Sequence, residues 1–405
     1  MNDYNKVTVI ITKSIFDLNG SAQSTQDMIR SIIKSKKKLI VISLDNYESA
    51  KKSFFTKSEL ENMELLNFHY PTSILNSFKT NNLKDLLFNL YWVFKYPLWR
   101  FKFNKKVNNL NCEFLILNNI SCINIYNRIS FKKIIFKILL IRESPEIYKL
   151  KNIDFSFETF YNLFQEFDKY IFVSSNVKDN WVKFLNLDIL KTFYIPNTIK
   201  ENISNKLINN EHIESKISCD FNIDKKTILC LASLQYHKGQ DILIKASKIL
   251  WDKNINNFEV VFMGNSTNDG NGVLKIINKL SKNYPIKYLR EKHPNEAMQY
   301  ISACDILILP SRTEAMPRVI LEAMSLKKII IASNVGGVPE LISNNENGLL
   351  FSSENFSQLS SIIEKVLNNF NNYGFLADAA YNRYWKVFSN LENYRNWNSF
   401  FKSMN

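Results

Sequence analysis

The sequence predicts an α/β protein made of two doubly wound domains. Two observations lead to this prediction. Short, strongly apolar runs alternate with longer segments of helical periodicity, which is typical of parallel sheets covered by helices. The chain also has 405 residues, which is long for one ordinary domain. Its 45% hydrophobic and 22% charged residues are typical of a globular protein with a large core.

The first half begins in the order strand, helix, strand. The apolar run 7–12 predicts a strand, and a polar turn containing Gly20 leads into a segment of helical spacing at 21–35. The run 37–45 predicts a second buried strand. Further runs of this kind predict strands at 112–118, 134–143, 170–175 and 192–197. Short connections between such elements are typical of a parallel sheet.

The second half repeats this alternation after a polar stretch. Residues 198–226 show no sustained apolar period, so we place the domain boundary at about 200–225. Beyond it, the pattern predicts strands at 227–233, 258–264, 286–290, 305–311, 327–333 and 348–351, with helices at 241–250, 272–282 and 295–303 and from Pro317 and Pro339. Apolar runs this continuous suit strands covered on both faces. The second half is therefore predicted to be a second Rossmann-like domain.

The net charge indicates the kind of partner, and the cysteine content indicates the cellular compartment. The formal net charge of +14 favours an anionic partner, such as nucleotide phosphates or an anionic membrane face. The five cysteines are odd in number and show no C-x-x-C spacing, which favours a reducing compartment and argues against structural zinc. We find no signal-peptide pattern and no apolar run of the roughly 20 residues needed to span a bilayer. We therefore expect a cytoplasmic protein that is soluble or lies on a membrane surface.

Two loops that follow predicted strands have the composition of anion sites. Lys238 and Gly239 lie just before Asp241, which we expect to cap the next helix. A lysine beside a helix start, with a glycine that allows close backbone approach, suits a diphosphate. Gly336 and Gly337 precede another helix and predict a second anion pocket. The alternatives are a solvated loop lysine and a plain strand-to-helix turn.

A third loop, "PSRTEAMPRVILEAM" (310–324), carries two glutamates separated by seven residues. Glu314 lies in the loop after a predicted strand, and Pro317 suits the start of the following helix. The helix should bury the face formed by Val319, Ile320, Ala323 and Met324. Glu322 then points away from this face, beside Arg318. The alternative interpretation is a solvated Arg318–Glu322 pair worth only about 0.3–0.5 kcal/mol.

Together these loops resemble a known family. The stretch 227–351 resembles the C-terminal domain of retaining GT-B glycosyltransferases, specifically glycosyltransferase family 4, through "SLQYHKGQDILIKA", "FMGN", "ACDILILPSRTEAMPRVILEAM" and "ASNVGGVPELI" in this order. The tail 386–404 is similar to the family's last helix, which crosses back onto the N-terminal domain. The resemblance implies an acceptor-binding domain at 1–200, with 381–405 packed back on it. It also implies a nucleotide-sugar-binding domain at 201–380 that faces the first across a cleft.

The resemblance also implies roles for single residues. Lys238 would neutralise the donor diphosphate as it leaves, and Glu314 would hold hydroxyls of the donor sugar together with the backbone N–H groups of Ala315 and Met316. Glu322 would accept hydrogen bonds from the ribose hydroxyls. The remaining donor-binding residues implied are Pro317, Arg318, Ser233, Gly264 and Gly20. The family's chemistry needs neither a metal ion nor a cofactor, and no D-x-D sequence occurs here.

The chain departs from the family pattern at several points. The family's usual Asn-Gly pair after the last strand of the N-terminal domain is here Asn197-Thr198, and a tryptophan common in the tail is here Asn390. Where the family often has Gly-Arg, this chain has Ala232-Ser233, so Gln235 or Arg290 would have to compensate for the missing arginine. A catalytic-side histidine common in the N-terminal domain has no counterpart, and the sequence Arg142-Glu143-Ser144 stands near the expected place. We therefore take Glu143 as the candidate catalytic residue of the first domain.

The segment 83–110 combines aromatic and basic side chains. Aromatic residues from Phe88 to Phe103 interleave there with Lys95, Arg100, Lys102, Lys105 and Lys106. This composition suits an anionic bilayer surface, where each basic side chain adds about 1 kcal/mol. The alternative is a pair of core-packing helices broken at Pro97.

These observations predict a retaining hexosyltransferase of the GT-B type that uses a nucleotide-sugar donor, with UDP favoured. The acceptor expected is a growing surface polysaccharide or lipopolysaccharide, lipid-linked and close to the membrane. A catalytically silent GT-B-like subunit is the alternative. Nucleic-acid binding would fit the charge, but no recognition motif of the RRM, KH or helix-turn-helix type is present.

Overall fold

The computed structural model describes residues 7–12, 15, 20–34, 38–44, 55–67, 97–98, 100–107, 112–126, 134–145, 157–208, 212–267 and 270–404. Its described residues form two compact units. Unit 1 comprises the described residues within 1–173, 177–195 and 394–405, and unit 2 comprises those within 174–176 and 196–393. Each unit is built on one parallel sheet.

Unit 1 contains a seven-stranded sheet in the order β3-β2-β1-β4-β5-β6-β7. Every neighbouring pair is parallel. The strands are β1 (Val7–Thr12), β2 (Lys38–Ser43), β3 (Met63–Asn67), β4 (Cys112–Asn118), β5 (Ile134–Ile141), β6 (Lys169–Phe172) and β7 (Thr192–Tyr194). The apolar runs predicted six of these strands, whereas β3 is short and was not predicted. The residues of β1 and β4 are fully buried, as expected for strands covered on both faces.

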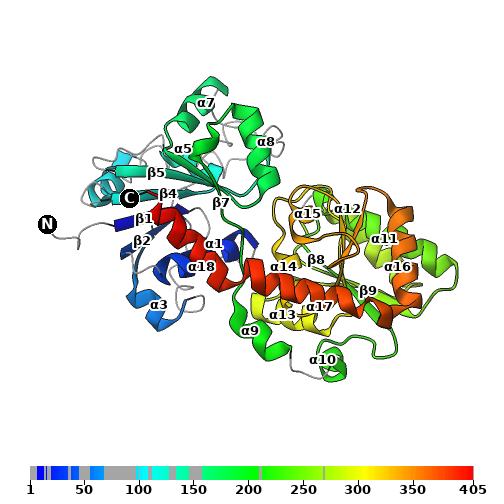
Figure 1. Ribbon diagram of the computed structural model, residues 1–405. Helices are drawn as coiled ribbons and strands as arrows, with labels where there is room; N and C mark the ends of the chain where they lie inside the picture. The colour runs from blue at the N-terminus through cyan, green and yellow to red at the C-terminus, as the bar shows by residue number, and fades with distance from the viewer. Residues whose placement is uncertain are drawn as a thin grey trace. The chain divides into compact units, whose positions relative to one another are not determined.

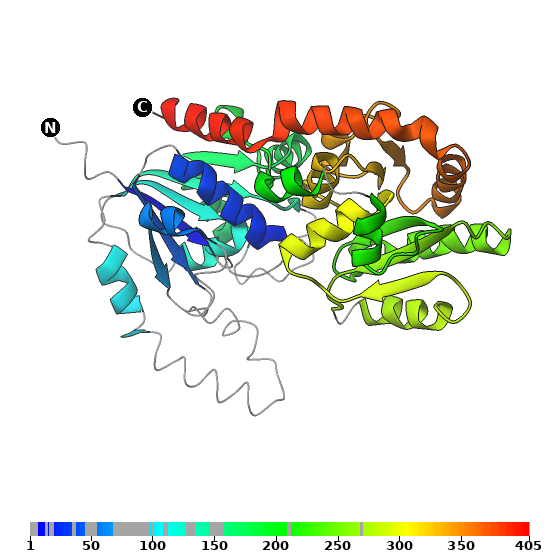
Figure 2. The ribbon, with the colours of Figure 1, turned by 90° about the horizontal axis from the view of Figure 1, so that it is seen from below.

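Helices cover both faces of this sheet (Figure 1). They are α1 (Gly20–Lys34), α3 (Lys57–Glu61), α5 (Ile123–Tyr126), α7 (Phe157–Gln165), α8 (Ser175–Leu185) and the end of α18 (Asn390–Lys402), with the 3₁₀ turns η3 (Ile120–Cys122) and η4 (Ile189–Lys191). Figure 2 shows α18, in red, alongside the strands of unit 1. There Phe401 packs on Phe114 of β4, with ring centroids 5.0 Å apart, and Phe400 packs on Phe193 of β7. The chain end is therefore part of the core of unit 1.

Unit 2 contains a six-stranded parallel sheet in the order β10-β9-β8-β11-β12-β13. The strands are β8 (Lys226–Leu231), β9 (Phe258–Met263), β10 (Ile286–Leu289), β11 (Ile306–Leu309), β12 (Ile329–Ser333) and β13 (Leu349–Phe351). All six coincide with predicted apolar runs. The two sheets confirm the predicted α/β class with two doubly wound sheets.

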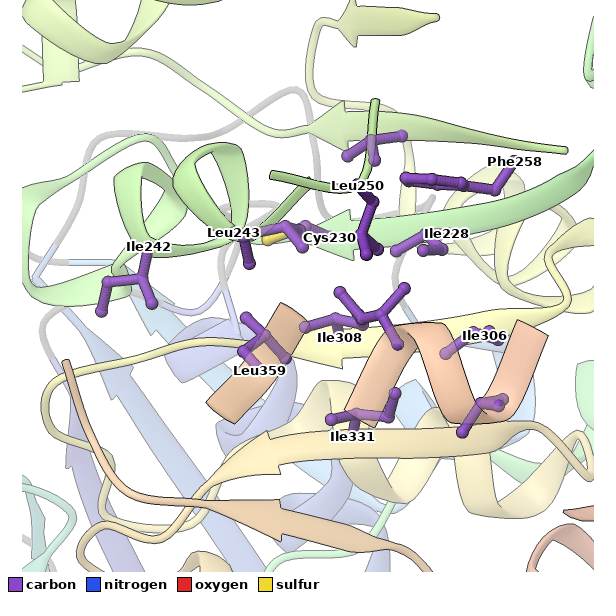
Figure 3. Close-up of a cluster of buried hydrophobic side chains, with 14 of the residues drawn as sticks. Ile228, Cys230, Ile242, Leu243, Leu250, Phe258, Ile306, Ile308, Ile331 and Leu359 are labelled. Carbon is purple, nitrogen blue, oxygen red and sulfur yellow. The ribbon is translucent and has the colours of Figure 1, made fainter. Parts of the chain in front are cut away.

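The helices of unit 2 also lie on both faces of its sheet (Figure 1). They are α9 (Glu201–Leu207), α10 (His212–Ser218), α11 (Gln240–Asp252), α12 (Asn271–Leu280), α13 (Pro294–Ala303), α14 (Arg318–Ser325), α15 (Val338–Leu341), α16 (Phe356–Asn368) and α17 (Gly374–Arg383), with the short turns η5 (Tyr236–Lys238), η7 (Phe370–Tyr373) and η8 (Tyr384–Phe388). Figure 3 shows the core between the sheet and the helices α11 and α16, where Leu243, Leu359, Ile308 and Ile331 belong to one cluster of buried apolar side chains. The polar stretch 198–226 is not a plain linker, because it forms α9 and α10, which pack against α13.

A buried ionic group ties α10 to the sheet of unit 2. Asp305, just before β11, lies 2.7 Å from Lys216 Nζ and 3.3 Å from Lys226 Nζ. Asp305 Oδ2 also accepts a hydrogen bond from the backbone N–H of Thr227 at 2.8 Å. The side chains of Asp305 and Lys216 are only 2% and 5% exposed, so each charge depends on the other for compensation.

The five cysteines are free and buried, and none forms a disulfide. Burial raises the pKa of the thiols of Cys112, Cys230 and Cys304 to about 12. These thiols are therefore protonated at neutral pH and act as small apolar side chains.

Candidate functional site

The candidate site lies in unit 2, where loops leave the carboxyl ends of neighbouring parallel strands. Hydrogen bonds between these loops are direct evidence that they meet. The backbone N–H of Arg312, after β11, donates to His237 O after β8 at 2.8 Å, and the N–H of Gly337, after β12, donates to Glu314 O at 3.1 Å. In doubly wound sheets this edge is where ligands bind.

Lys238 and Glu314 form the central charged pair. Lys238 Nζ donates to Glu314 Oε1 at 2.7 Å, and the hydroxyl of Ser311 donates to the same oxygen at 2.7 Å. Both partners of the ion pair are largely buried, which strengthens their attraction relative to a solvated pair. The alternative of a solvated loop lysine is therefore wrong. Lys238 and Glu314 are 76 residues apart in sequence, and the sheet brings them together.

Gly239 allows the loop of Lys238 to approach the loop of Glu314. Its backbone is left-handed, with φ of 66°, and a Cβ at this position would lie 2.0 Å from Pro310 O. No residue with a side chain fits there without displacing the backbone. Gly239 also takes the N-cap position of α11, so the predicted capping role of Asp241 is wrong. Asp241 instead lies in the first turn and pairs with Arg312.

Gly336 and Gly337 pack closely against the backbone of the loop that carries Glu314. A Cβ on Gly336 would lie 1.8 Å from Glu314 O, and one on Gly337 would lie 1.8 Å from Ala315 O. The N–H of Gly337 is already used by Glu314 O. The glycine pair therefore serves close packing that holds the backbone of Glu314 and Ala315. The helix that follows, α15, is a single turn.

Glu322 and Arg318 pair on α14, one turn apart. Arg318 Nη2 lies 3.6 Å from Glu322 Oε1, and their side chains are only 9% and 12% exposed. Arg318 Nη1 also donates to Thr198 O at 2.8 Å. The interpretation of this pair as a solvated surface contact is therefore wrong. The opposite face of α14 is buried, as its periodicity predicted.

The backbone between Glu314 and α14 is held by a contact that the sequence did not predict. Asn197 donates from its backbone N–H to Met316 Sδ at 3.1 Å and from Nδ2 to Met316 O at 3.2 Å. Pro317 takes the N-cap position of α14. Among the described residues, we find no acceptor for the backbone N–H of Ala315 or Met316. These two N–H groups are the donors that the family resemblance assigns to the sugar.

Ser233 and Gly264 lie side by side after β8 and β9. A Cβ on Gly264 would lie 2.2 Å from Ala232 O, so the glycine is needed for this approach. Gln240 Nε2 donates to Ser233 O at 2.8 Å, and the hydroxyl of Tyr288 donates to Gly264 O at 2.8 Å. The residues that stand where the family often has Gly-Arg therefore form an ordered part of the same edge.

Two predicted site residues, Glu143 and Gly20, belong to unit 1. Glu143 follows β5, where Asn119 Nδ2 donates to its Oε1 at 3.4 Å and Trp181 Nε1 donates to its backbone oxygen at 2.8 Å. Gly20 is exposed and is the first residue of α1. These two residues do not take part in the loop contacts of unit 2 described above.

Beside Glu143, a polar network links three strand ends of unit 1. Asn118 Nδ2, at the end of β4, donates to Thr12 Oγ1 at 2.9 Å and to Thr25 Oγ1 at 2.7 Å. Arg142 Nε donates to Asn118 Oδ1 at 3.2 Å. This network was not predicted as a unit. A polar residue directly at the end of each apolar run is the signal that could have indicated it.

Comparisons with known proteins bear on both the fold and this site. Residues 213–383 match the family model of glycosyl transferases group 1. The matched region contains all residues of the candidate site in unit 2 described above except Asn197 and Thr198. This match confirms the resemblance to glycosyltransferases that the motifs predicted.

Among curated proteins, an uncharacterized glycosyltransferase of Methanocaldococcus jannaschii is 31% identical over 184 residues, 44% of this chain and 48% of that protein. The N,N'-diacetylbacillosaminyl-diphospho-undecaprenol alpha-1,3-N-acetylgalactosaminyltransferase of Campylobacter jejuni is 32% identical over 151 residues, 37% of this chain and 38% of that protein. The chain thus spans less than half the length of these relatives.

The fold also matches solved structures over its whole length. The crystal structure of HepE from Anabaena, in complex with UDP and glucose, superposes with a TM-score of 0.73 at 18% identity, covering 99% of this chain and 100% of that chain. The chain therefore has the fold of GT-B glycosyltransferases. Among the described residues, no helix is long and apolar enough to cross a membrane, and no group of three or more His, Cys, Asp or Glu side chains could hold a metal ion.

Proposed function

We propose that the protein is a retaining glycosyltransferase of family 4 that transfers a hexosyl group from a UDP-sugar to a growing surface polysaccharide or lipopolysaccharide. The observation that carries the proposal is the largely buried Lys238–Glu314 pair at the carboxyl edge of the unit 2 sheet. It combines a cation for a diphosphate with a carboxylate for sugar hydroxyls within 2.7 Å. The proposed reaction uses neither a metal ion nor a cofactor.

Each residue of the edge has a role in this proposal. Lys238 neutralises the negative charge that grows on the departing diphosphate, where a fixed cation in a partly buried site is most effective. Glu314 and the N–H groups of Ala315 and Met316 hold the transferred sugar. Glu322 accepts hydrogen bonds from the ribose hydroxyls, because an ionised carboxylate accepts hydrogen bonds and cannot donate them.

The remaining predicted residues support these groups. Arg318 and Pro317 fix the start of α14 and so the place of Glu322. Ser233 and Gly264 provide backbone contacts for the rest of the nucleotide. In unit 1, Glu143 acts on the acceptor side, and Gly20 lets the start of α1 approach the ligands.

Two of the similar proteins support the proposed donor and the proposed acceptor. The HepE structure contains UDP, which supports a uridine nucleotide. The name of the Campylobacter jejuni relative includes a diphospho-undecaprenol group, which supports a lipid-linked acceptor. We propose that the transfer takes place on the cytoplasmic side of a membrane. We assign the acceptor to unit 1 and the donor to unit 2.

Binding calorimetry tests the donor site. We expect UDP to bind the wild type, and Glu322→Ala to weaken binding by about 1–3 kcal/mol, the scale of hydrogen bonds to a charged group. Glu346→Gln, an exposed position in the turn before β13, is the matched control and should leave the affinity unchanged. UDP, GDP and their sugars are compared in the same series.

A catalytically silent subunit with the same fold is the second candidate. It is favoured by Ser233, which stands where the family often has an arginine. If the wild type binds neither UDP, GDP nor any of their sugars, the donor site proposed here is wrong and this second candidate is preferred.

We further propose that part of the segment 83–110 docks on an anionic membrane. Only 97–98 and 100–107 are described, and they are helical. Leu98 and Phe101 are 62% and 67% exposed, whereas Phe103 is buried. Arg100, Lys102 and Lys105 are also exposed. Exposed apolar and basic side chains on one helix suit the headgroup region of an anionic bilayer.

Vesicle sedimentation tests this docking. We expect the protein to sediment with vesicles containing phosphatidylglycerol but not with neutral vesicles. Replacing Arg100, Lys102 and Lys105 by Gln should weaken binding about a hundredfold, at about 1 kcal/mol for each charge. The control removes three exposed lysines of and beside α12, Lys275, Lys279 and Lys282. Equal losses in both variants would show a general charge effect and contradict docking through this helix.

A further inference from the structure

A cluster of charged residues beside the candidate site has no role in the function proposed above. Its centre is Arg312, two residues before Glu314. Arg312 forms a two-pronged pair with Asp241, from Nη1 to Oδ1 and from Nη2 to Oδ2, both at 2.9 Å. It also donates from Nε and Nη2 to the carboxylate of Glu354, which lies before α16.

The side chain of Arg312 also contacts the turn that carries Lys238. Arg312 Nη1 donates to Tyr236 O at 2.6 Å, and its guanidinium lies 4.0 Å from the centre of the Tyr236 ring. The backbone N–H of Arg312 donates to His237 O at 2.8 Å. Arg312 is thus bonded to the two residues that precede Lys238, and through Asp241 to the helix that follows it.

The shifts in the pKa values of Arg312 and Asp241 indicate a strong ion pair between them. Burial by itself would raise the pKa of Asp241, but the hydrogen bonds and the charge of Arg312 outweigh it and lower that pKa. The hydrogen bonds to Asp241 raise the pKa of Arg312, although its partial burial acts in the opposite direction. Both groups therefore remain charged throughout the neutral pH range.

We propose that Arg312 is a positioning residue, which holds the turn 236–239 so that the ammonium group of Lys238 stays against Glu314 and the donor diphosphate. This role rests on the donor site proposed above. In the described part of the chain, no hydrogen bond joins Arg312 to Lys238 or to Glu314, so Arg312 acts through the turn. A lysine could not replace it, because the contacts need a planar group with several donors in a fixed geometry.

Hydrogen exchange of the ligand-free protein tests whether Arg312 stabilises the turn. This experiment needs no nucleotide. The N–H of Lys238 donates to Gln235 O at 2.9 Å, and that of Gly239 donates to Tyr236 O at 3.2 Å. We expect Arg312→Ala and Arg312→Lys to speed exchange of these two amides. The control is Glu364→Gln, which removes the Lys253–Glu364 pair between α11 and α16. Unchanged exchange of the turn in both Arg312 variants would overturn the proposal.

A double-mutant cycle then tests whether Arg312 acts through Lys238. We expect Arg312→Ala to weaken UDP binding at least about tenfold in the wild-type background, the scale of lost hydrogen bonds to a charged group. In a Lys238→Ala background the same substitution should change the affinity by less than about twofold, because its effect has already been lost. Equal effects in both backgrounds would overturn a role through Lys238.

The two tests distinguish a failure of the positioning role of Arg312 from a failure of the proposed donor site. If the wild type binds no UDP and no UDP-sugar, the donor site is wrong, and the exchange data still decide whether Arg312 holds the turn. If the wild type binds UDP and Lys238→Ala weakens it, the donor site stands, and the exchange data and the cycle together decide the role of Arg312.

Discussion

Replacing Glu314 by Gln should lower sugar transfer at least about a hundredfold, the scale expected when a reacting group is no longer held in place. The same variant should bind UDP at least as tightly as the wild type. The two results differ because Glu314 Oε1 accepts from Lys238 Nζ at 2.7 Å. Removing the negative charge frees Lys238 for the diphosphate, while the sugar loses the carboxylate that holds it.

Transfer is measured with the UDP-sugar that binds most tightly in calorimetry, and UDP affinity is measured on the same preparations. Lys238→Ala provides the opposite pattern, with weaker UDP binding and slower transfer. Glu346→Gln, on an exposed turn, controls for the loss of one negative charge. Transfer by Glu314→Gln at the wild-type rate would remove Glu314 from the proposed mechanism.

Replacing Asp305 by Ala should destabilise the protein by about 3–5 kcal/mol, the cost of leaving a buried charge without its partner. Lys216 would lack its carboxylate partner in a site where its side chain is only 5% exposed. The backbone N–H of Thr227 would also lose its acceptor. Urea unfolding, followed by tryptophan fluorescence, measures the change.

The matched control is Asp378→Ala, which removes the surface pair with Lys327. These two side chains are 63% and 45% exposed, so the loss should stay within about 1 kcal/mol. Similar changes for both variants would contradict the buried network as a major source of stability. Asp305→Asn retains an acceptor for Thr227 and should fall between the two.

The strands that lie within the sheets could be predicted from sequence, because a strand covered on both faces must be apolar along its whole length. The run 134–143 shows the limit of this signal. The strand β5 ends at Ile141, and the polar Arg142 and Glu143 lie in the loop that follows. The strand β3 was missed because it is a short edge strand whose second residue, Glu64, and last residue, Asn67, are polar, which leaves no continuous apolar run.

The loops of the candidate site could also be placed from sequence, since they follow directly after predicted strands. Glycine requirements at 239, 336 and 337 agree with this placement. The tertiary structure shows in each case which carbonyl oxygen the glycine must approach. Whether a glycine serves an anion or a neighbouring backbone depends on atoms that are distant in the chain.

The sequence by itself determined the two doubly wound sheets and the candidate loops, because both depend on local periodicity and on chain direction. Only the tertiary structure decided which charges meet. Lys238 pairs with Glu314 across 76 positions, and Arg312 pairs with Asp241 across 71. Such pairs leave no local pattern, because each partner is an ordinary polar residue until the fold removes water from around it.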